Sequence, residues 1–334
     1  MSSLGGAAEV PVAGVVVACD VGGTGIKAGL VDAAGRVHRA VTVPTPVVDG
    51  DGDATAKAIL DQVAQLISEL AAVETPAGVG VIVPGLVDPA TGTAVYAENL
   101  GWHDVPFVAR PAEASGLPVA FAHDVRSAGA AEQRFGAGRG YRDVAFVPIG
   151  TGISAGLMLD GRPYRSAWAG EIGHIDVGSG LPCPCGARGC LETVASAAAI
   201  ARRYTERSGR PVAGALDVAE RLNSGSGSSG SSGSGAGSAD PDARAVWDEA
   251  VDALAFVLAV TAAVVAPELI IIGGGLSGAG AVLLEPLRQG VARRVTPPQL
   301  QPQLVGAALG EQAGLLGAAL LAWEKVGVTM QGPG

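Results

Sequence analysis

Three cysteines and one histidine are clustered near the middle of the chain. The histidine ends the run Gly170–His174 (GEIGH), and the cysteines lie in the segment Cys183–Glu192 (CPCGARGCLE). Three thiolates and one imidazole nitrogen complete a tetrahedral Zn²⁺ ligand set, which leaves no position open for a reacting molecule. The spacing therefore predicts a structural zinc site that fixes a loop, and the alternative is a loop of reduced, unliganded thiols. The predicted ligands are His174, Cys183, Cys185 and Cys190.

A glycine-rich run separates two strand-like segments near the start of the sequence. The run is Asp20–Lys27 (DVGGTGIK), which follows the β-branched segment Val15–Ala18 and overlaps the strand-like segment Ile26–Val31. A P-loop closes with a Lys-Ser/Thr pair, which is missing here. A dinucleotide fingerprint matches weakly, but its pyrophosphate site needs a helix after the glycines, and here a strand follows. The remaining interpretations are an ordinary glycine-rich hairpin and a phosphate-binding turn, of which we favour the second.

In a phosphate-binding turn the backbone N–H groups face phosphate oxygens, and glycine provides both the close approach and the positive φ. The aspartate at the strand end, Asp20, would hold Mg²⁺ directly or through water. A threonine hydroxyl and a lysine ammonium group would add further contacts to phosphate. The predicted residues are Asp20, Gly22, Gly23, Thr24, Gly25 and Lys27.

Two later glycine runs also follow strand-like segments. Gly150-Thr151-Gly152 follows Val144–Ile149, and a returning strand is predicted over Ser154–Leu159. This strand–loop–strand unit lies about 130 residues after the first one, which indicates two related halves. The third run is Gly273, Gly274 and Gly275, after the buried strand predicted over Leu269–Ile272.

The elements that must position these residues follow from the apolar pattern. A third strand over Val37–Val43 makes the opening an antiparallel hairpin or meander. The Ser/Gly/Ala-only segment Ser224–Ala239 predicts a flexible insertion within the second half of the chain. The other predicted elements are the helices Ala54–Val73, Ala253–Ala266 and Ala281–Arg294 and the strands Gly78–Val83 and Val119–Ala122, the last ending at His123 and Asp124.

Composition limits the class of protein. The chain has 334 residues, enough for two domains, and its formal net charge of −10 argues against nucleic acid as a partner. The N-terminus lacks the basic residues and apolar core of a signal peptide. The most apolar stretch, Ala253–Ala266, is shorter than the ~20 residues that span a bilayer, so no membrane partner is expected. Clustered cysteines without an export signal favour metal binding in the cytoplasm over disulfides.

Together, these motifs resemble those of the ROK family of sugar kinases and regulators, within the actin/hexokinase superfamily. The resemblance rests on motifs that stand in the family's order from Asp20 to Gly275, and the GEIGH and CPCGARGC pair is its most specific part. The remaining matching pieces are Val83–Asp88 (VPGLVD), Glu98–Trp102 (ENLGW), the strand ending at Asp124, and the three glycine loops.

The resemblance implies an α/β fold of two actin-like lobes, each built on a ribonuclease-H-like sheet, with a structural zinc loop. The N-terminal lobe would hold residues 1–121 and a last helix within 311–334 that packs back on it. The C-terminal lobe would hold residues 122–310. ATP with Mg²⁺ would be the phosphate donor, and the adenosine would lie near Gly273–Gly275. A homodimer or homotetramer is also implied.

The resemblance also implies roles for single residues. Asp124 would be the general base that takes the proton from a sugar hydroxyl as its oxygen attacks the γ-phosphorus. His174 would use one ring nitrogen for zinc and the other for the sugar. The positions that match sugar contacts are Asn99, Asp124, Glu171, His174 and Glu192.

The chain departs from the family pattern near the general base. His123 stands where the family usually has an asparagine that contacts the sugar, and it would either replace that contact or point into the core. Arg126 replaces a small or polar residue, and Ser154 stands where a further glycine is common.

The sequence leaves four functions open. The favoured one is an ATP-dependent kinase acting on the 6-hydroxyl of an aldohexose, with glucose first. N-acetylglucosamine or N-acetylmannosamine is the second choice of substrate, and polyphosphate is an alternative donor. A sugar sensor without catalysis is the non-enzymatic alternative. A DNA-binding repressor is set aside because only 19 residues precede Asp20 and none has a helical pattern.

Overall fold

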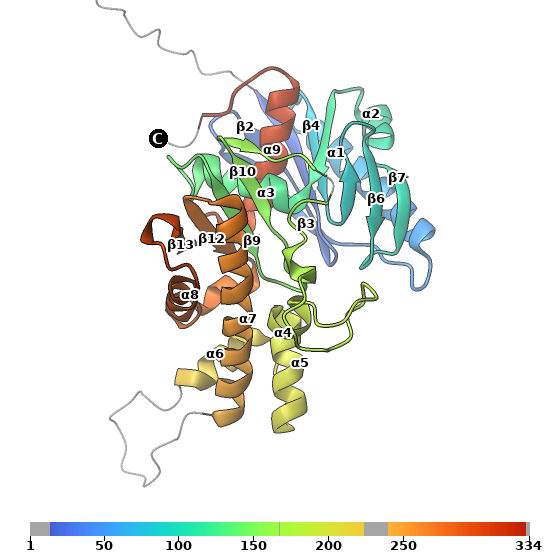
Figure 1. Cartoon of the computed structure of the whole chain (residues 1–334). Coiled ribbons are helices and arrows are strands. Elements are labelled where there is room, and N and C mark those ends of the chain that lie inside the picture. Colours follow the sequence, from blue (N-terminus) through green and yellow to red (C-terminus); the bar gives the residue numbers. More distant parts are fainter. Residues whose placement is uncertain (1–13, 167, 224–239, 332–334) are drawn as a thin grey trace, which may run out of the picture. The chain divides into compact units, whose positions relative to one another are not determined.

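The computed structural model describes residues 14–166, 168–223 and 240–331, so the predicted insertion at Ser224–Ala239 lies outside the described residues. The chain forms two compact units (Figure 1). Unit 1 holds the described residues up to Ala131 and those from Glu311 onward, and unit 2 is Glu132–Gly310.

The sequence-based border between the lobes lies after residue 121, whereas the division in the structure falls after Ala131. The difference arises at helix α3 (Asp124–Phe135), whose first half packs on the last helix, α9 (Ala313–Lys325). A Cβ on Gly317 of α9 would lie only 2.4 Å from the carbonyl oxygen of Ser127. This close packing ties the start of α3 to unit 1.

Unit 1 contains a five-stranded sheet of order β3-β2-β1-β4-β8. β1, β2 and β3 form the predicted antiparallel meander, whereas β4 and β8 run parallel to β1. β1 reads VVVACDV and is almost wholly buried, as expected for a strand covered on both faces. The strands are β1 (Val15–Val21), β2 (Gly25–Asp32), β3 (Val37–Pro44), β4 (Val79–Val83) and β8 (Val119–His123).

Helices and a small extra sheet complete unit 1. Helix α1 (Gly52–Ala71) begins after Asp51, whose carboxylate accepts the Ala54 N–H at 2.8 Å as an N-cap. Helix α9 packs against β1 and β4, and Gly80 of β4 is required because a Cβ there would lie 1.9 Å from the carbonyl oxygen of Ala318. The sequence analysis did not predict the three-stranded sheet or the short helix α2. These are β5 (Leu86–Asp88), β6 (Thr93–Ala97), β7 (Trp102–Pro106) and α2 (Ala109–Ser115).

Unit 2 contains a second five-stranded sheet, of order β11-β10-β9-β12-β13. β9, β10 and β11 are antiparallel, and β12 and β13 run parallel to β9, so the strand directions match those of unit 1. Asp160 and Gly161 form the hairpin turn between β10 and β11, with φ of 52° and 76°. The strands are β9 (Val144–Pro148), β10 (Gly156–Leu159), β11 (Arg162–Pro163), β12 (Leu269–Gly273) and β13 (Gln303–Gly306).

The helices of unit 2 cover this sheet and carry the largest apolar core of the unit. The predicted apolar helix at Ala253–Ala266 is the second half of a longer helix, α7. Within the described part of the chain, none of the helices combines the length and apolar character needed to cross a bilayer. The α-helices are α4 (Glu192–Ala195), α5 (Ala197–Ser208), α6 (Ala215–Asn223), α7 (Pro241–Val265) and α8 (Ala281–Arg294).

Candidate active site

The first glycine loop is a tight turn between β1 and β2, as predicted. The Gly22 N–H donates to the carbonyl oxygen of Gly25 at 2.9 Å, and the Thr45 hydroxyl donates to the Gly22 carbonyl at 2.6 Å. The predicted positive φ is wrong, because Gly22, Gly23 and Gly25 are not among the glycines with positive φ. Glycine instead provides steric space, because a Cβ on Gly23 would lie 2.6 Å from Nδ2 of Asn99. The loop therefore holds one predicted sugar contact, Asn99, directly against the predicted phosphate turn.

Two opposite charges flank this turn. Asp20 on β1 and Lys27 on β2 are register partners across the antiparallel pair. The Lys27 ammonium donates to the Glu311 carboxylate at 3.1 Å. Burial raises the pKa of Asp20 to about 7, the charge of Asp124 adds to the rise, and Lys27 opposes it.

Asp124 is the first residue of α3 and directly follows β8, so the strand runs into the helix without a loop. An aspartate is favourable there because the free N–H groups of the first turn attract negative charge. The Asp124 Oδ1 atom accepts the Val125 N–H at 2.7 Å and lies 3.2 Å from Nδ1 of His123. The side chain keeps 28% of its surface exposed, which leaves the carboxylate accessible to a substrate hydroxyl.

Burial also dominates the electrostatics around Asp124. It raises the pKa of Asp124 to about 7, against the lowering effects of the Val125 N–H and the Arg126 charge. Burial and Arg126 lower the pKa of His123 to about 3, so this imidazole is neutral at physiological pH. His123 is only 7% exposed, and its Nδ1 faces the Val125 N–H at 3.2 Å. The departure at position 123 thus places a buried, neutral ring beside the predicted general base.

The second and third glycine loops lie together in unit 2. The Ile149 N–H donates to the Gly273 carbonyl at 2.9 Å, and the Leu276 N–H donates to the Ile149 carbonyl at 3.1 Å. Gly274 has a φ of 72°, and a Cβ there would lie 2.5 Å from the Ile149 carbonyl oxygen, so only glycine fits. Thr151 and Gly152 are exposed at the tip of the second loop.

The GEIGH run packs against the segment that follows the second loop. Gly170 has a φ of 95° and accepts the Ala155 N–H on its carbonyl at 2.7 Å. A Cβ on Gly173 would lie 2.2 Å from the Ile153 carbonyl oxygen. These two glycines fix the positions of Glu171 and His174 relative to the Gly150 loop.

The four predicted zinc ligands come together as expected. Their ligand atoms all lie within 4.8 Å of one another. The Sγ atoms of Cys185 and Cys190 are 3.7 Å apart, and Cys183 Sγ is 3.8 Å from Nδ1 of His174. Thiolates bound to one Zn²⁺ at ~2.3 Å lie about 3.8 Å apart, so the donor set fits a tetrahedral zinc ion.

Glu192 links the zinc cluster to the second glycine loop. Its Oε2 atom accepts the Ile153 N–H at 3.2 Å, and its Oε1 atom lies 3.8 Å from Nδ1 of His174. A Cβ on Gly152 would lie 3.0 Å from the same Oε2 atom. Glu171, His174 and Glu192 therefore form one group in unit 2, whereas Asn99, His123 and Asp124 belong to unit 1.

The structure adds site residues that the sequence analysis missed. Thr45, Glu311 and Gly314 contact the first glycine loop or its charged neighbours, and none of them lies in a recognisable motif. Glu132 of α3 is fully buried, and its carboxylate accepts the N–H groups of Ala137 (3.0 Å), Ala308 (3.2 Å) and Leu309 (2.8 Å).

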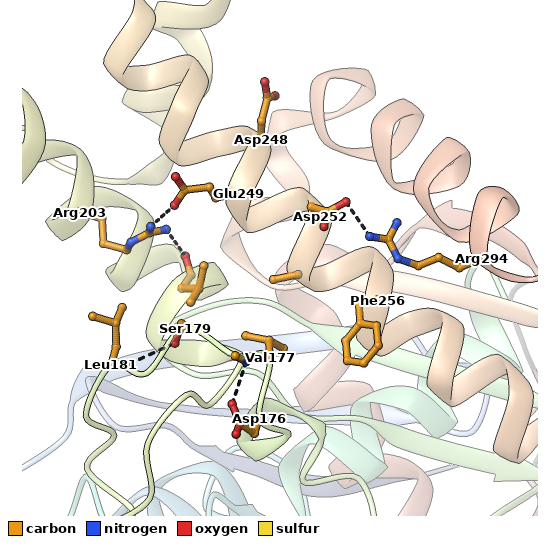
Figure 2. Close-up of a pocket in the computed structure, with 13 residues that line it drawn as sticks. Asp176, Val177, Ser179, Leu181, Arg203, Asp248, Glu249, Asp252, Phe256 and Arg294 are labelled. Atoms are coloured by element: carbon orange, nitrogen blue, oxygen red, sulfur yellow. Dashed lines mark hydrogen bonds and ion pairs between the residues drawn. The ribbon is translucent and has the colours of Figure 1, made fainter.

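A separate groove of about 840 Å³ lies in unit 2 between α7 and the segment after His174. Figure 2 shows Phe256 on the same side of α7 as Glu249 and Asp252, facing Val177. Arg203 pairs with Glu249, and Arg294 pairs with Asp252 at 2.7 Å. Phe256 is 42% exposed, which makes it the main apolar side chain offered to solvent in this groove.

Comparison with known proteins places the chain in a family. A model of the ROK family matches residues 16–325, and the chain belongs to this family. A glucokinase from Thermotoga maritima is 33% identical over 317 residues, covering 93% of this chain and 98% of the glucokinase.

Two solved structures are similar along nearly the whole chain. A ROK family glucokinase from Streptomyces griseus, in complex with glucose and AMPPNP, has 31% identity and a TM-score of 0.74, covering 93% of this chain and 100% of its own. A ROK hexokinase from Thermus thermophilus has 32% identity and a TM-score of 0.73, covering 94% of this chain and 99% of its own.

Proposed function

We propose that this protein is an ATP-dependent hexose kinase that phosphorylates the 6-hydroxyl of glucose. The observation that carries the proposal is Asp124, a partly exposed carboxylate at the start of α3 whose pKa is raised to about 7. A base with a pKa near the working pH combines a large ionised fraction with strong proton affinity. The similarity to glucokinases over more than nine-tenths of the chain supports glucose as the sugar.

The reaction balances with Asp124 as the only proton acceptor. The oxygen of the sugar 6-hydroxyl forms a bond to the γ-phosphorus as the bond to the β–γ bridging oxygen breaks. The hydroxyl proton passes to the Asp124 carboxylate, and ADP leaves with the bridging oxygen. Phosphoryl transfer otherwise requires the protein mainly to position the reacting groups and to neutralise charge.

The glycine loops and the charges beside them would bind the donor. Gly22–Gly25 and Lys27 act from unit 1, whereas Gly150–Gly152 and Gly273–Gly275 act from unit 2. Asp20 and Asp124 raise the local negative charge, which fits a cation site near Asp20. Mg²⁺ held there would neutralise phosphate charge. Polyphosphate remains the alternative donor.

Each unit by itself holds polar residues proposed to contact sugar. Asn99, His123 and Asp124 act from unit 1, and Glu171, His174 and Glu192 act from unit 2. Zn²⁺ on Nδ1 of His174 would fix the tautomer and orientation of the ring, which leaves Nε2 for a sugar hydroxyl. N-acetylglucosamine and N-acetylmannosamine are the alternative substrates.

The proposal includes the partners and location of the protein. Four cysteines without disulfides, three of them in one metal-binding cluster, are typical of a reducing compartment, so we place the protein in the cytoplasm. The formal charge of −10 disfavours nucleic acid. The groove at Phe256 is a candidate contact in a homodimer or homotetramer, and sedimentation of Phe256→Glu beside the unaltered protein tests it.

The test of the function is ADP release with Mg-ATP across five sugars: glucose, N-acetylglucosamine, mannose, N-acetylmannosamine and fructose. Turnover of glucose above the others, lost in Asp124→Asn, supports the proposal. Turnover of an N-acetyl sugar instead replaces the substrate but keeps the mechanism. Turnover with polyphosphate alone replaces the donor, and binding of sugar without turnover from either donor makes the protein a sensor.

A further inference from the structure

The first turn of α9 lies directly against Asp20. A Cβ on Gly314 would be 2.1 Å from Oδ2, 2.6 Å from Cγ and 3.2 Å from Oδ1 of Asp20. The first two distances are shorter than real Cβ contacts, and the third is tighter than most of them. The Asp20 carboxylate therefore occupies the space that any other side chain at position 314 would need.

Glycine is an unfavourable choice at this position for the helix itself. Helix α9 reads AGLLGAALLAWEK, and apart from Gly314 and Gly317 its first ten residues are all alanine or leucine. Glycine lowers helix stability relative to alanine because its backbone loses more freedom on folding. Neither glycine has a positive φ, so backbone conformation does not explain them. Close neighbours must explain both.

The two glycines of α9 meet different kinds of neighbour. Gly317 faces the backbone carbonyl of Ser127, with 2.4 Å to the oxygen, so it allows α9 and α3 to pack. For Gly314, the three atoms nearest to an added Cβ all belong to the Asp20 carboxylate, the end of a short side chain. A Cβ at position 317 would push two helices apart, whereas one at position 314 would turn a carboxylate away from its place.

The start of α9 also holds the second charge of the phosphate turn. Glu311 lies in the 3₁₀ turn Gly310–Gln312 just before α9, and its carboxylate binds the Lys27 ammonium at 3.1 Å. The Glu311 carbonyl oxygen lies 3.5 Å from the same ammonium. The segment Glu311–Gly314 thus contacts both Lys27 and Asp20, which are partners across β1 and β2.

We propose that Gly314 is a positioning residue that seats the Asp20 carboxylate against the first turn of α9 for binding of the Mg²⁺-nucleotide. This inference rests on the proposed function, because Asp20 has a metal-binding role only if the donor is a phosphate compound. Gly314 itself touches no substrate and acts through Asp20. Gly317 serves the packing of the fold alone.

The consequence of Gly314→Ala follows from which atoms can move. The carboxylate of Asp20 can rotate away, so the fold tolerates the new methyl group. Alanine also improves the helix, so the melting temperature stays near that of the unaltered protein. The affinity for Mg²⁺-nucleotide falls about tenfold or more, the scale expected when the orientation of a metal ligand is disturbed. The KM for sugar changes less than twofold.

The experiment combines calorimetric titration of Mg-AMPPNP, sugar kinetics and thermal melting for four proteins. These are the unaltered chain, Gly314→Ala, Asp20→Ala and the double variant. Removal of the Asp20 carboxylate frees the space at position 314, so Gly314→Ala has no further effect on nucleotide affinity in that background. Gly317→Ala is the matched control, with lower thermal stability and a nucleotide affinity within threefold of the unaltered chain.

Three results would overturn the inference. Unchanged Mg-AMPPNP affinity in Gly314→Ala is the first, and an equal loss caused by Gly314→Ala with and without the Asp20 carboxylate is the second. The third is failure of both Gly314→Ala and the double variant to fold. If Gly314→Ala fails to fold but the double variant folds, the result supports the contact between position 314 and the Asp20 carboxylate. Failure of the unaltered chain to bind nucleotide or turn over sugar refutes the proposed function itself and is seen before any variant is made.

Discussion

The two five-stranded sheets have the same strand order and the same directions, yet the ends of their matching strands carry different groups. In unit 1, β1 ends next to Asp20 and β8 runs into Asp124. At the matching ends in unit 2, β9 is followed by Ile149 and Gly150, and β13 by Ala307. One scaffold therefore presents two carboxylates at these strand ends in the first unit, and isoleucine, glycine and alanine at the matching ends in the second.

The difference shows that one sheet topology can carry groups suited to two kinds of chemistry. Carboxylates suit proton transfer and cation binding, and in unit 1 they are placed where burial raises their pKa values to about 7. Backbone N–H groups suit phosphate oxygens, and every residue of the two glycine runs of unit 2 except Thr151 is glycine. The zinc cluster is the addition that gives unit 2 ordered polar groups of its own.

A second contrast lies within α3, between Asp124 and Glu132. Both are acidic residues of one helix, but Glu132 is completely buried and receives three backbone N–H groups. Asp124 accepts the Val125 N–H and has a raised pKa. The fully buried carboxylate with three backbone donors supports the fold, and the partly exposed one with the raised pKa is the candidate base.

The largest expected effect comes from removing the proposed general base, Asp124, which tests the contrast between the two sheets. In Asp124→Asn we expect kcat to fall about 10³-fold, because the amide cannot accept the hydroxyl proton, with little change in the KM for ATP. The matched control is Asp104→Asn, an exposed aspartate of unit 1 whose φ of 50° suits asparagine equally well. A loss below tenfold in steady-state ADP release assigns the base elsewhere.

The second contrast is tested by Glu132→Ala. Removal of this carboxylate leaves three partly buried N–H groups without their acceptor, which we expect to cost about 3 kcal/mol of unfolding free energy. Urea denaturation monitored by circular dichroism measures the cost. Glu206→Ala, at an exposed position of α5, should change stability by less than about 0.5 kcal/mol. Equal effects of the two substitutions would contradict the structural role of Glu132.

Zinc removal tests what the cluster gives to unit 2. In Cys185→Ser we expect loss of bound zinc, measured by mass spectrometry of metals, and a rise of about tenfold in the KM for glucose because His174 loses its fixed orientation. Cys19→Ala is the control, since Cys19 is buried in β1 and is not a member of the cluster, so the variant keeps its zinc. Full glucose affinity in the zinc-free protein refutes the link between metal and sugar.

The smallest expected effect is on the pH profile. Asp124 must be ionised to accept a proton, so kcat/KM should fall about tenfold per pH unit as the pH drops below about 7. His123 does not titrate in this range, because its pKa is lowered to about 3. Arg126→Gln removes a charge that lowers the Asp124 pKa and should shift the acid limb to higher pH. A flat profile from pH 6 to 8 would exclude this assignment.

The sequence predicts what depends on local pattern. The buried β-branched run of β1, the meander, α1 and the four metal ligands are all encoded by residue type and spacing over short distances. The start of α3 at Asp124 was missed because a strand runs straight into the helix without a separate capping residue. The three-stranded sheet was missed because its strands are short and broken by glycine and proline.

Other site residues leave no sequence signal at all. Glu132 is held by backbone N–H groups, which every residue except proline carries, so its partners at Ala308 and Leu309 have no distinctive types. Gly314 meets Asp20 from the opposite end of the chain. The prediction of a positive φ in the first loop was wrong. Glycine is needed at Gly23 because a Cβ there would collide with Asn99, and not because of the backbone conformation.

The return of α9 to unit 1 has a consequence for synthesis on the ribosome. β1 and β4 leave the ribosome early, but the helix that covers them is made only after the roughly 180 residues of unit 2. At ~5–20 residues per second this delay lasts about 10–40 s, long enough for a contiguous domain to fold. Unit 2 is therefore complete first, while the surface of β1 and β4 that α9 covers stays exposed until the last helix is made.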